Sequence, residues 1–350
     1  MANNSIIGMD LGDRSHIVVA LEADGQETEC SKVVNTRTSV KQFFQKYSGA
    51  TVAIEAGTHS AWISRLLEEL SCRVYVGNPY KLRMIWDSTD KSDERDARML
   101  AMVCRLEPRL LWPVRHRNVN AHVDLETIKA RDILVQSRTK LINHVRSVVK
   151  AVGERLPSYS AESFANRVPD LLPELLRPAL RPLVDTIADL TVKIKDMNKQ
   201  IDRLIEDRYP EAQRLQQIKG VGPVTALAFV LTLEDPGRFT KSRQVGPYLG
   251  LTPRRDQSGD TDKQLRITKA GNKYMRQLLV SCAHHIIGPF GPDSNLRRYG
   301  LTIAAHGGKN ARKRAAVAVA RKLAVVMHRL WVSGQDYVPL YALPKIQKAA

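Results

Sequence analysis

The sequence has little cysteine, and what it has is scattered. Its 4 cysteines form no CxxC pair and no Cys/His spacing typical of a zinc ligand set. They are Cys30, Cys72, Cys104 and Cys282. We therefore expect neither a disulfide framework nor a zinc site, and reduced thiols as in a cytoplasm.

Long apolar runs are missing as well. No segment approaches the roughly 20 apolar residues that a membrane-spanning helix needs. The first residues also lack the basic segment and apolar run of a signal peptide. The hydrophobic content of 43% is nevertheless enough for ordinary packed cores. We therefore expect a soluble, folded, cytoplasmic protein without a membrane partner.

Acidic residues become scarce toward the C-terminus. Residues 1–100 carry 12 Lys and Arg against 14 Asp and Glu, whereas residues 251–350 carry 18 against 5. The formal net charge of +18 is thus concentrated in the last third of the chain. Such a gradient favours a polyanionic partner, because basic side chains neutralise phosphates and release counterions. The charge pattern indicates a nucleic-acid-binding protein.

Residues 1–112 show the alternation of strands and helices typical of an α/β domain. Short apolar runs predict strands, and 3.6-residue periodicity predicts helices between them. A turn sequence between the first two runs predicts a hairpin. The expected strands cover 6–9, 17–21, 52–54 and 74–76, and the expected helices cover 61–70 and 93–106.

Residues 113–212 predict a helical, coiled-coil middle region. Apolar residues recur every seven positions in a first helix, at Ile128, Val135, Ile142 and Val149. Five prolines between 157 and 182 interrupt the helices. Three further heptads of apolar residues follow between 183 and 204, a spacing typical of a coiled-coil seam. The two helices pair either within the chain or between chains, and a dimerising or RNA-gripping stalk is consistent with both.

Residues 213–332 predict a mainly α-helical C-terminal domain, followed by a loose tail over 333–350. Helices are expected over 272–287 and 311–330, and an all-polar loop over 256–262. The turn from Gly220 to Gly222 resembles a helix-hairpin-helix, whose backbone N–H groups can hold a DNA phosphate. It can equally be a plain helix connection.

Four carboxylates stand at positions suited to a metal site. Asp10 and Glu55 each follow an apolar strand, and Asp93 and Asp96 share one face of a predicted helix. Carboxylate oxygens are the ligands that Mg²⁺ prefers, and such ions assist displacement at a phosphate. Taken alone, each acid is more often a solvated surface residue. Rival ligands are Asp13, Asp87, Asp90 and Glu94.

A serine in the polar loop has basic neighbours. Ser258 lies in a Gln-Ser-Gly segment with no nearby histidine, so a hydrolase triad is poorly supported. A serine in such a loop is usually a turn residue. The basic neighbours suit either a solvated loop or a loop that faces phosphates. These neighbours are Arg254, Arg255, Lys263, Arg266 and Lys269.

Several motifs, in order along nearly the whole chain, resemble one transposase family. They include Met-Asp-Leu-Gly, Ile-Glu-Ala-Gly and Lys-Ser-Asp-Glu-Arg-Asp-Ala-Arg in the first half. Ile-Lys-Gly-Val-Gly-Pro and Gly-Leu-Thr-Pro-Arg-Arg-Asp-Gln-Ser-Gly follow in the second half. The family is that of the insertion-sequence recombinases guided by a bridge RNA, to which pilin-gene invertases are related.

The resemblance implies a fold and a chemistry. It implies an RNase H-like (RuvC-like) DEDD domain in which Asp10, Glu55, Asp93 and Asp96 bind Mg²⁺. It also implies a C-terminal domain in which Ser258 joins DNA through a phosphoserine link, so that both domains, from one or two subunits, contribute to the reaction. The implied partners are donor and target DNA, an element-encoded bridge RNA and further copies of the chain in a dimer or tetramer. Its implied location is the prokaryotic nucleoid.

Three other readings stay open from the sequence. A DNA invertase of the same architecture would act at one chromosomal locus. A RuvC-like junction nuclease would hydrolyse DNA with water and would not need Ser258. A catalytically inactive descendant of a transposase would bind nucleic acid only. Flanking DNA, a covalent protein–DNA adduct and an activity measurement, respectively, separate these readings.

Overall fold

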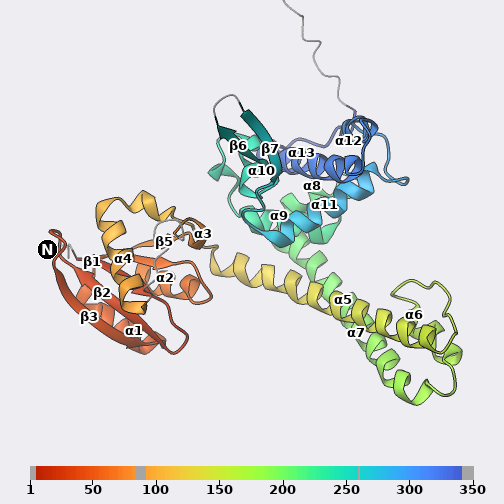
Figure 1. Ribbon diagram of the computed structural model, residues 1–350, viewed down its shortest axis with the longest axis horizontal. Helices are drawn as coiled ribbons and strands as arrows, with labels where there is room; N and C mark the ends of the chain where they lie inside the picture. Colours follow the sequence, from red (N-terminus) through yellow and green to blue (C-terminus); the bar gives the residue numbers. More distant parts are fainter. Residues whose placement is uncertain (1–4, 83–91, 259–260, 341–350) are drawn as a thin grey trace, which may run out of the picture. The chain divides into compact units, whose positions relative to one another are not determined.

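The computed structural model describes residues 5–82, 92–258 and 261–340. The chain divides into two compact units, one of residues 1–118 and one of residues 119–350 (Figure 1). Among the helices in the described ranges, none combines the length and the apolar character needed to cross a membrane.

A five-stranded mixed sheet forms the centre of the first unit, in the order β3-β2-β1-β4-β5. β1 (Ile6–Asp10), β2 (Ser15–Leu21) and β3 (Glu27–Val34) are antiparallel neighbours. β4 (Thr51–Glu55) and β5 (Arg73–Gly77) run parallel to β1. The predicted hairpin and the α/β class are confirmed. β3 is not among the expected strands, because this edge strand is mostly exposed and carries polar residues along its length.

Helices cover both faces of this sheet. α1 (Arg37–Phe44) and α2 (Ser60–Glu69) pack on one face, against residues such as Met9 and Ile54. α4 (Asp93–Leu106) packs on the other face, against residues such as Ala53. Successive strand residues alternate between the two cores, as the pleat requires. The short helices of this unit are η1 (Gln45–Tyr47), α3 (Pro79–Leu82) and η2 (Pro108–Leu111).

Two long helices, α5 (Val119–Ala151) and α7 (Arg177–Arg208), pair side by side in the second unit (Figure 1). The first turns of α5 share a core with the last turns of α7, so the two helices are antiparallel. At their far end a separate core includes Val149, Phe164 and Val184. The seam residues therefore pair within the chain. The short helices between them are α6 (Phe164–Arg167) and η3 (Pro169–Leu171).

The expected proline-broken stretch is shorter than predicted. Pro178 and Pro182 lie inside α7, near its start at Arg177. Pro178 fits the first helical turn, because the N–H that it lacks would have no partner inside the helix there. Pro182 lies inside the helix, where it removes one backbone hydrogen bond. The helix therefore begins before the heptad pattern becomes visible in the sequence.

The core of the second unit surrounds α9 (Pro223–Leu233), which is buried on all sides from Thr225 to its end. A helix that is apolar all round has no face for water. α8 (Pro210–Leu215), α11 (Lys273–Ile287) and α13 (Ala311–Ser333) contribute to this core. The helices expected over 272–287 and 311–330 are confirmed by α11 and α13. The other helices here are η4 (Pro236–Arg238), η5 (Ser242–Gln244), α10 (Val245–Tyr248) and α12 (Asn295–Ala305).

The segment after α13 is not loose, at least as far as residue 340. The Tyr337 N–H donates to Gln217 Oε1 at 2.7 Å, and Gln217 Nε2 donates to Asp336 at 2.8 Å. The Asn295 N–H donates to the Pro339 carbonyl at 2.9 Å. The prediction of a loose tail is therefore wrong for residues 334–340, because long-range hydrogen bonds hold them. Residues 341–350 lie outside the described ranges.

Candidate functional site

Asp10 and Glu55 end two neighbouring parallel strands. The register of β1 and β4 pairs Met9 with Ile54, so the next residue of each strand, Asp10 and Glu55, follows at the same edge. Both side chains belong to residues that are half-buried. The placement follows from the sequence pattern, since the carboxyl ends of adjacent parallel strands meet at one edge of a sheet.

Both acids belong to the face of the sheet that α4 covers. A Cβ on Gly8 would lie 1.9 Å from the carbonyl oxygen of Ala97, which shows that β1 and α4 touch backbone to backbone there. Ala53 of β4 packs in the α4 core. Asp10 lies two residues after Gly8, and Glu55 two after Ala53, so each acid points to the same face.

α4 brings two more acids to the same end of the sheet. Its residue Ala97 lies against Gly8, whereas Arg105 near its other end lies against Gly25, in the turn between β2 and β3. That turn is at the Ile6 end of β1, so the helix starts at the Asp10 end. Its first turn carries three acids, Asp93, Glu94 and Asp96.

Capping and an ion pair fix the start of α4. The Ser92 side chain accepts a hydrogen bond from the Arg95 N–H, which satisfies a free donor of the first turn. Acids in this turn are favoured by the helix dipole. Arg98 donates to Glu27 of β3 at 2.6 Å, and this hydrogen bond lowers the pKa of the Glu27 carboxyl. The helix that carries the acids is thereby fastened to the sheet at its own first turns.

The four carboxylates have the chemistry of a Mg²⁺ site, because all of their donors are hard oxygens. Asp10, Glu55 and Asp96 each make interactions with other protein groups. Within the described ranges, no three acidic, histidine or cysteine side chains are arranged as a ligand cluster. The donor set thus fits the ion in its chemistry, although the described side chains are not gathered around one point.

The rival acids are placed less favourably. Asp13 is 95% exposed and contacts His59 Nε2 at 3.4 Å, on the turn between β1 and β2. Glu94 is exposed in the first turn of α4, as Asp93 is, so exposure does not separate these two. Asp87 and Asp90 lie outside the described residues. Among the described acids, Asp10 and Glu55 are distinguished by their shared edge and face.

Ser258 belongs to a β-hairpin and not to the predicted polar loop. β6 (Pro253–Ser258) pairs antiparallel with β7 (Thr261–Ile267), and Ser258 is opposite Thr261 in the register. The loop prediction is wrong because polar residues on both faces hide the alternation that marks a strand. The dipeptide Gly259-Asp260, typical of a two-residue hairpin connection, was the available signal.

Basic residues lie on both strands of this hairpin. Arg254 and Arg255 are exposed on β6, and Arg266 is exposed on β7. Lys263 also belongs to β7. Lys269, just after the hairpin, is exposed and has a φ of +58°. Four of the predicted nucleic-acid contacts, Arg254, Arg255, Lys263 and Arg266, therefore share the hairpin with Ser258.

A buried arginine that sequence reasoning missed holds the base of the hairpin. Arg276 of α11 is 9% exposed, and its Nη1 donates to the carbonyls of Leu249 (3.2 Å), Gly271 (3.1 Å) and Ala270. Gly250 has a φ of +67°, and a Cβ there would lie 2.3 Å from the Ala270 carbonyl oxygen. Arg276 thus holds the two chain segments at the base of the hairpin next to each other.

The predicted helix-hairpin-helix turn lies between α8 and α9. Gly220 has a φ of +100°, and Gly222 is the N-cap of α9. A Cβ on Gly220 would lie 2.9 Å from the His285 ring, so the fold itself requires glycine there. A role in holding DNA stays a prediction.

Comparison with known proteins identifies both halves. A model described as transposase of the IS116/IS110/IS902 family matches residues 212–298, and a DEDD transposase model of the IS110 type matches residues 7–153. The chain is 27% identical over 293 residues to a probable family 20 transposase of Pseudomonas aeruginosa, covering 81% of this chain and 85% of the relative.

Two further relatives are transposases of named insertion sequences. The chain is 28% identical over 290 residues to that of IS1328 from Yersinia enterocolitica, covering 81% of this chain and 84% of the relative. It is 28% identical over 256 residues to that of IS1111A from Coxiella burnetii, covering 71% and 69%. Two matched models of one family, with these relatives, show that the chain belongs to the IS110/IS116 family of insertion-sequence transposases.

Proposed function

We propose that this transposase cuts and rejoins DNA through a phosphoserine intermediate at Ser258, assisted by Mg²⁺ at Asp10, Glu55, Asp93 and Asp96. One observation carries the proposal: two strand ends and one helix start bring the four acids to the same end of one sheet. The match of this unit to a DEDD-type transposase supports the assignment.

Serine chemistry suits an enzyme that exchanges strands. The Ser258 oxygen forms a bond to phosphorus while the bond from phosphorus to a deoxyribose oxygen breaks, and the serine proton ends on that leaving oxygen. The hydroxyl of a second strand then attacks the phosphoserine and restores the serine. Each step replaces one phosphodiester by another, so the cycle needs no external energy source.

The carboxylates have a separate task. When bound, Mg²⁺ stabilises the charge that develops on the phosphate oxygens. Asp10 and Glu55 present their carboxylates from rigid strand ends, and Asp93 and Asp96 present theirs from the capped first turn of α4. Rigid elements hold ligands more accurately than loops do.

Sequence recognition is assigned to an RNA encoded by the element, with the protein gripping backbone and shape as in other RNA-guided systems. The excess of 18 basic over 5 acidic residues in 251–350 supports a large phosphate-binding surface. Only 6% of residues are aromatic, which agrees with little base stacking by the protein. The acting form is a homo-oligomer, a dimer or a tetramer.

An in vitro recombination reaction tests the serine. Full-length protein with its co-purified RNA, Mg²⁺, and donor and target duplexes is resolved on a denaturing gel. We expect recombinant DNA and a protein–DNA adduct that disappears in Ser258→Ala and persists weakly in Ser258→Cys. Full recombination by Ser258→Ala refutes the proposal, and cleavage without an adduct indicates a nuclease that uses water.

A matched pair of acids tests the metal site. Asp10→Asn should lose at least 100-fold in strand cleavage, whereas Asp13→Asn, on the exposed turn three residues later, should retain it. Removal of divalent ions with EDTA should abolish cleavage, and added Mg²⁺ should restore it. Equal activity of the two variants would show that Asp10 holds no essential ion.

A further inference from the structure

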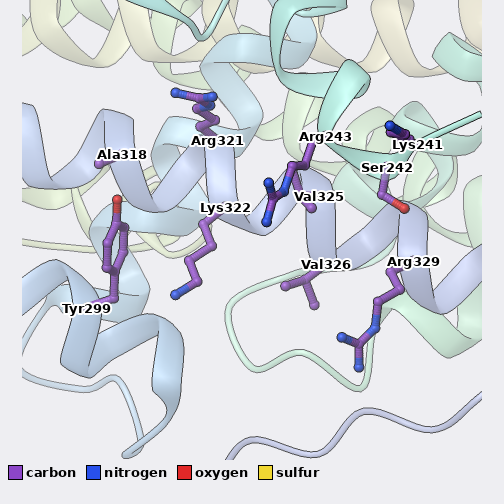
Figure 2. Close-up of a pocket in the computed structure, with 10 residues that line it drawn as sticks. All are labelled: Lys241, Ser242, Arg243, Tyr299, Ala318, Arg321, Lys322, Val325, Val326 and Arg329. Atoms are coloured by element: carbon purple, nitrogen blue, oxygen red, sulfur yellow. The ribbon is translucent and has the colours of Figure 1, made fainter. Parts of the chain in front are cut away.

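A basic groove lies in the second unit and is formed by segments that flank the Ser258 hairpin in the sequence. It has a volume of about 670 Å³ and is lined by residues of η5, α12 and α13 (Figure 2). Five basic residues line it: Lys241, Arg243, Arg321, Lys322 and Arg329. None of the ten lining residues is acidic.

These five cations have no carboxylate partners in the part of the chain that the structure describes. The ion pairs found there involve other residues. The sequence explains why, since residues 236–255 and 294–335 contain no Asp or Glu at all. Lysine and arginine side chains that converge without counter-charges repel one another, so an anion stabilises their arrangement.

The fold builds this groove from segments distant in sequence. His328 of α13 is 1% exposed; its Nε2 donates to the Pro236 carbonyl at 3.0 Å, and its Nδ1 bonds the Ser242 hydroxyl at 3.0 Å. This buried histidine fastens the loop that carries Lys241 and Arg243 to the helix. On the same wall, a Cβ on Gly246 would lie 3.2 Å from the Cγ of Arg321, so the arginine stem packs on that glycine.

We propose that this groove binds the sugar–phosphate backbone of double-stranded DNA. Arg321 and Arg329 are eight residues apart on α13, about 12 Å along the helix axis. This spacing suits separate phosphates along one strand better than a single phosphate group. DNA is the polyanion on which a transposase acts. The choice of DNA as the bound polymer is the one part of this inference that rests on the proposed function.

The groove suits a paired duplex better than unpaired bases. Proteins that bind single strands usually offer exposed aromatic rings on which bases stack. The one aromatic residue lining this groove, Tyr299, is 38% exposed, and Lys322 Nζ lies 4.3 Å from its ring centre. The groove thus offers five cations and a single ring whose face a lysine already contacts, a lining that suits backbone charge and not base identity.

The test measures how the affinity for a duplex depends on salt. The variant combines Lys241→Gln, Arg243→Gln and Arg329→Gln, three exposed residues whose replacement leaves the core intact. A matched control removes three exposed charges from the first unit, Lys32→Gln, Lys41→Gln and Arg73→Gln. Both full-length proteins have the same net charge, and thermal unfolding checks that each is folded.

If the three groove residues each contact a phosphate, the salt slope for a random-sequence DNA duplex falls by about 2.7. Wild-type affinity then drops about 40-fold more than that of the groove variant between 50 and 200 mM salt. The control variant should keep the wild-type slope. Equal slopes for the groove variant and wild type, with both folded, overturn the proposal.

A parallel titration with an RNA duplex of the same sequence separates the two polymers. A loss confined to RNA also overturns the assignment to DNA. The binding measurement needs no strand cleavage, so it is independent of Ser258 and Asp10. If the groove variant has the smaller salt slope but the wild-type protein forms no protein–DNA adduct, only the proposed serine chemistry is refuted. If the wild-type protein forms the adduct but the groove variant keeps the wild-type salt slope, only this inference is refuted.

Discussion

Gly8 is the point at which the sheet and the helix that carries two of the acids come closest. In Gly8→Ala, the added Cβ would lie 1.9 Å from the Ala97 carbonyl oxygen and 2.6 Å from the Ala101 nitrogen. Ordinary contact begins at 3.4 Å, so α4 must retreat by about 1.5 Å, the difference between the two distances. Both clashing atoms are backbone, so no side-chain rotation relieves them.

The cost should appear in stability and in activity together. Forcing extra atoms into a packed contact costs about 3 kcal/mol, at the upper end of the usual range. A retreat of α4 also moves Asp93 and Asp96 away from Asp10, and a misplacement of about 1 Å can cost 100-fold in rate. Urea unfolding and strand cleavage with Mg²⁺ measure the two effects.

Gly57→Ala is the matched control for this prediction. No atom lies within 4 Å of a Cβ at Gly57, which lies two residues after Glu55, the last residue of β4. This variant should keep wild-type stability within about 0.5 kcal/mol and wild-type activity. Wild-type behaviour of Gly8→Ala would show that α4 does not rest on β1 as described, and would refute the argument that places the acids together.

Two further predictions concern a buried arginine and an acid. In Arg276→Met, the Thr268 and Lys269 amides should exchange their hydrogens about 100-fold faster than in the wild type. The reason is that a hydrogen bond from a charged group contributes about 1.5–3 kcal/mol to stability. Arg297→Met, which removes comparable bonds to the Ile286 and Gly288 carbonyls, should leave these amides protected, and equal exchange in both variants would contradict the clamp. Burial raises the pKa of Glu29, but hydrogen bonds from Lys46, Tyr47 and Ser31 outweigh it and lower the pKa to about 2. Glu29→Gln should therefore lower the free energy of unfolding by about 1 kcal/mol above pH 4.5, and this difference should vanish as the pH falls toward 2. Urea unfolding at several pH values measures it, and a difference that does not change with pH would contradict the prediction.

The sequence predicted the parts of the fold that have a local pattern. Apolar runs such as that of β4 mark buried strands, and the capped, amphipathic stretch from Asp93 marks α4. The edge strand β3 and the Ser258 hairpin were missed or misread, since exposed strands carry polar residues on both faces. An acid directly after each of two buried strands was enough to predict that Asp10 and Glu55 lie together.

The supporting residues could not be predicted in the same way. Gly8 carried a weak signal, because an isolated glycine in a strand often marks a close backbone approach. Arg276 carried none, since a helical arginine is normally solvated, and only the folded chain brings the carbonyls of Leu249, Ala270 and Gly271 to it. Likewise, the pairing of His328 with Ser242 joins residues 86 positions apart.

The antiparallel pair of α5 and α7 has one hydrophobic core at its base and another at its tip. Between them the contacts are partly polar, as in the hydrogen bond from Arg131 to Asn198 at 2.8 Å. Deleting seven residues from each helix in this stretch would keep both cores. The apolar residues of the two helices would still face each other, because their pattern repeats every seven residues. It would shorten the pair by about 10 Å, the length of about three base pairs of DNA. The pair is thus a spacer whose length evolution can adjust in fixed increments without rebuilding either end.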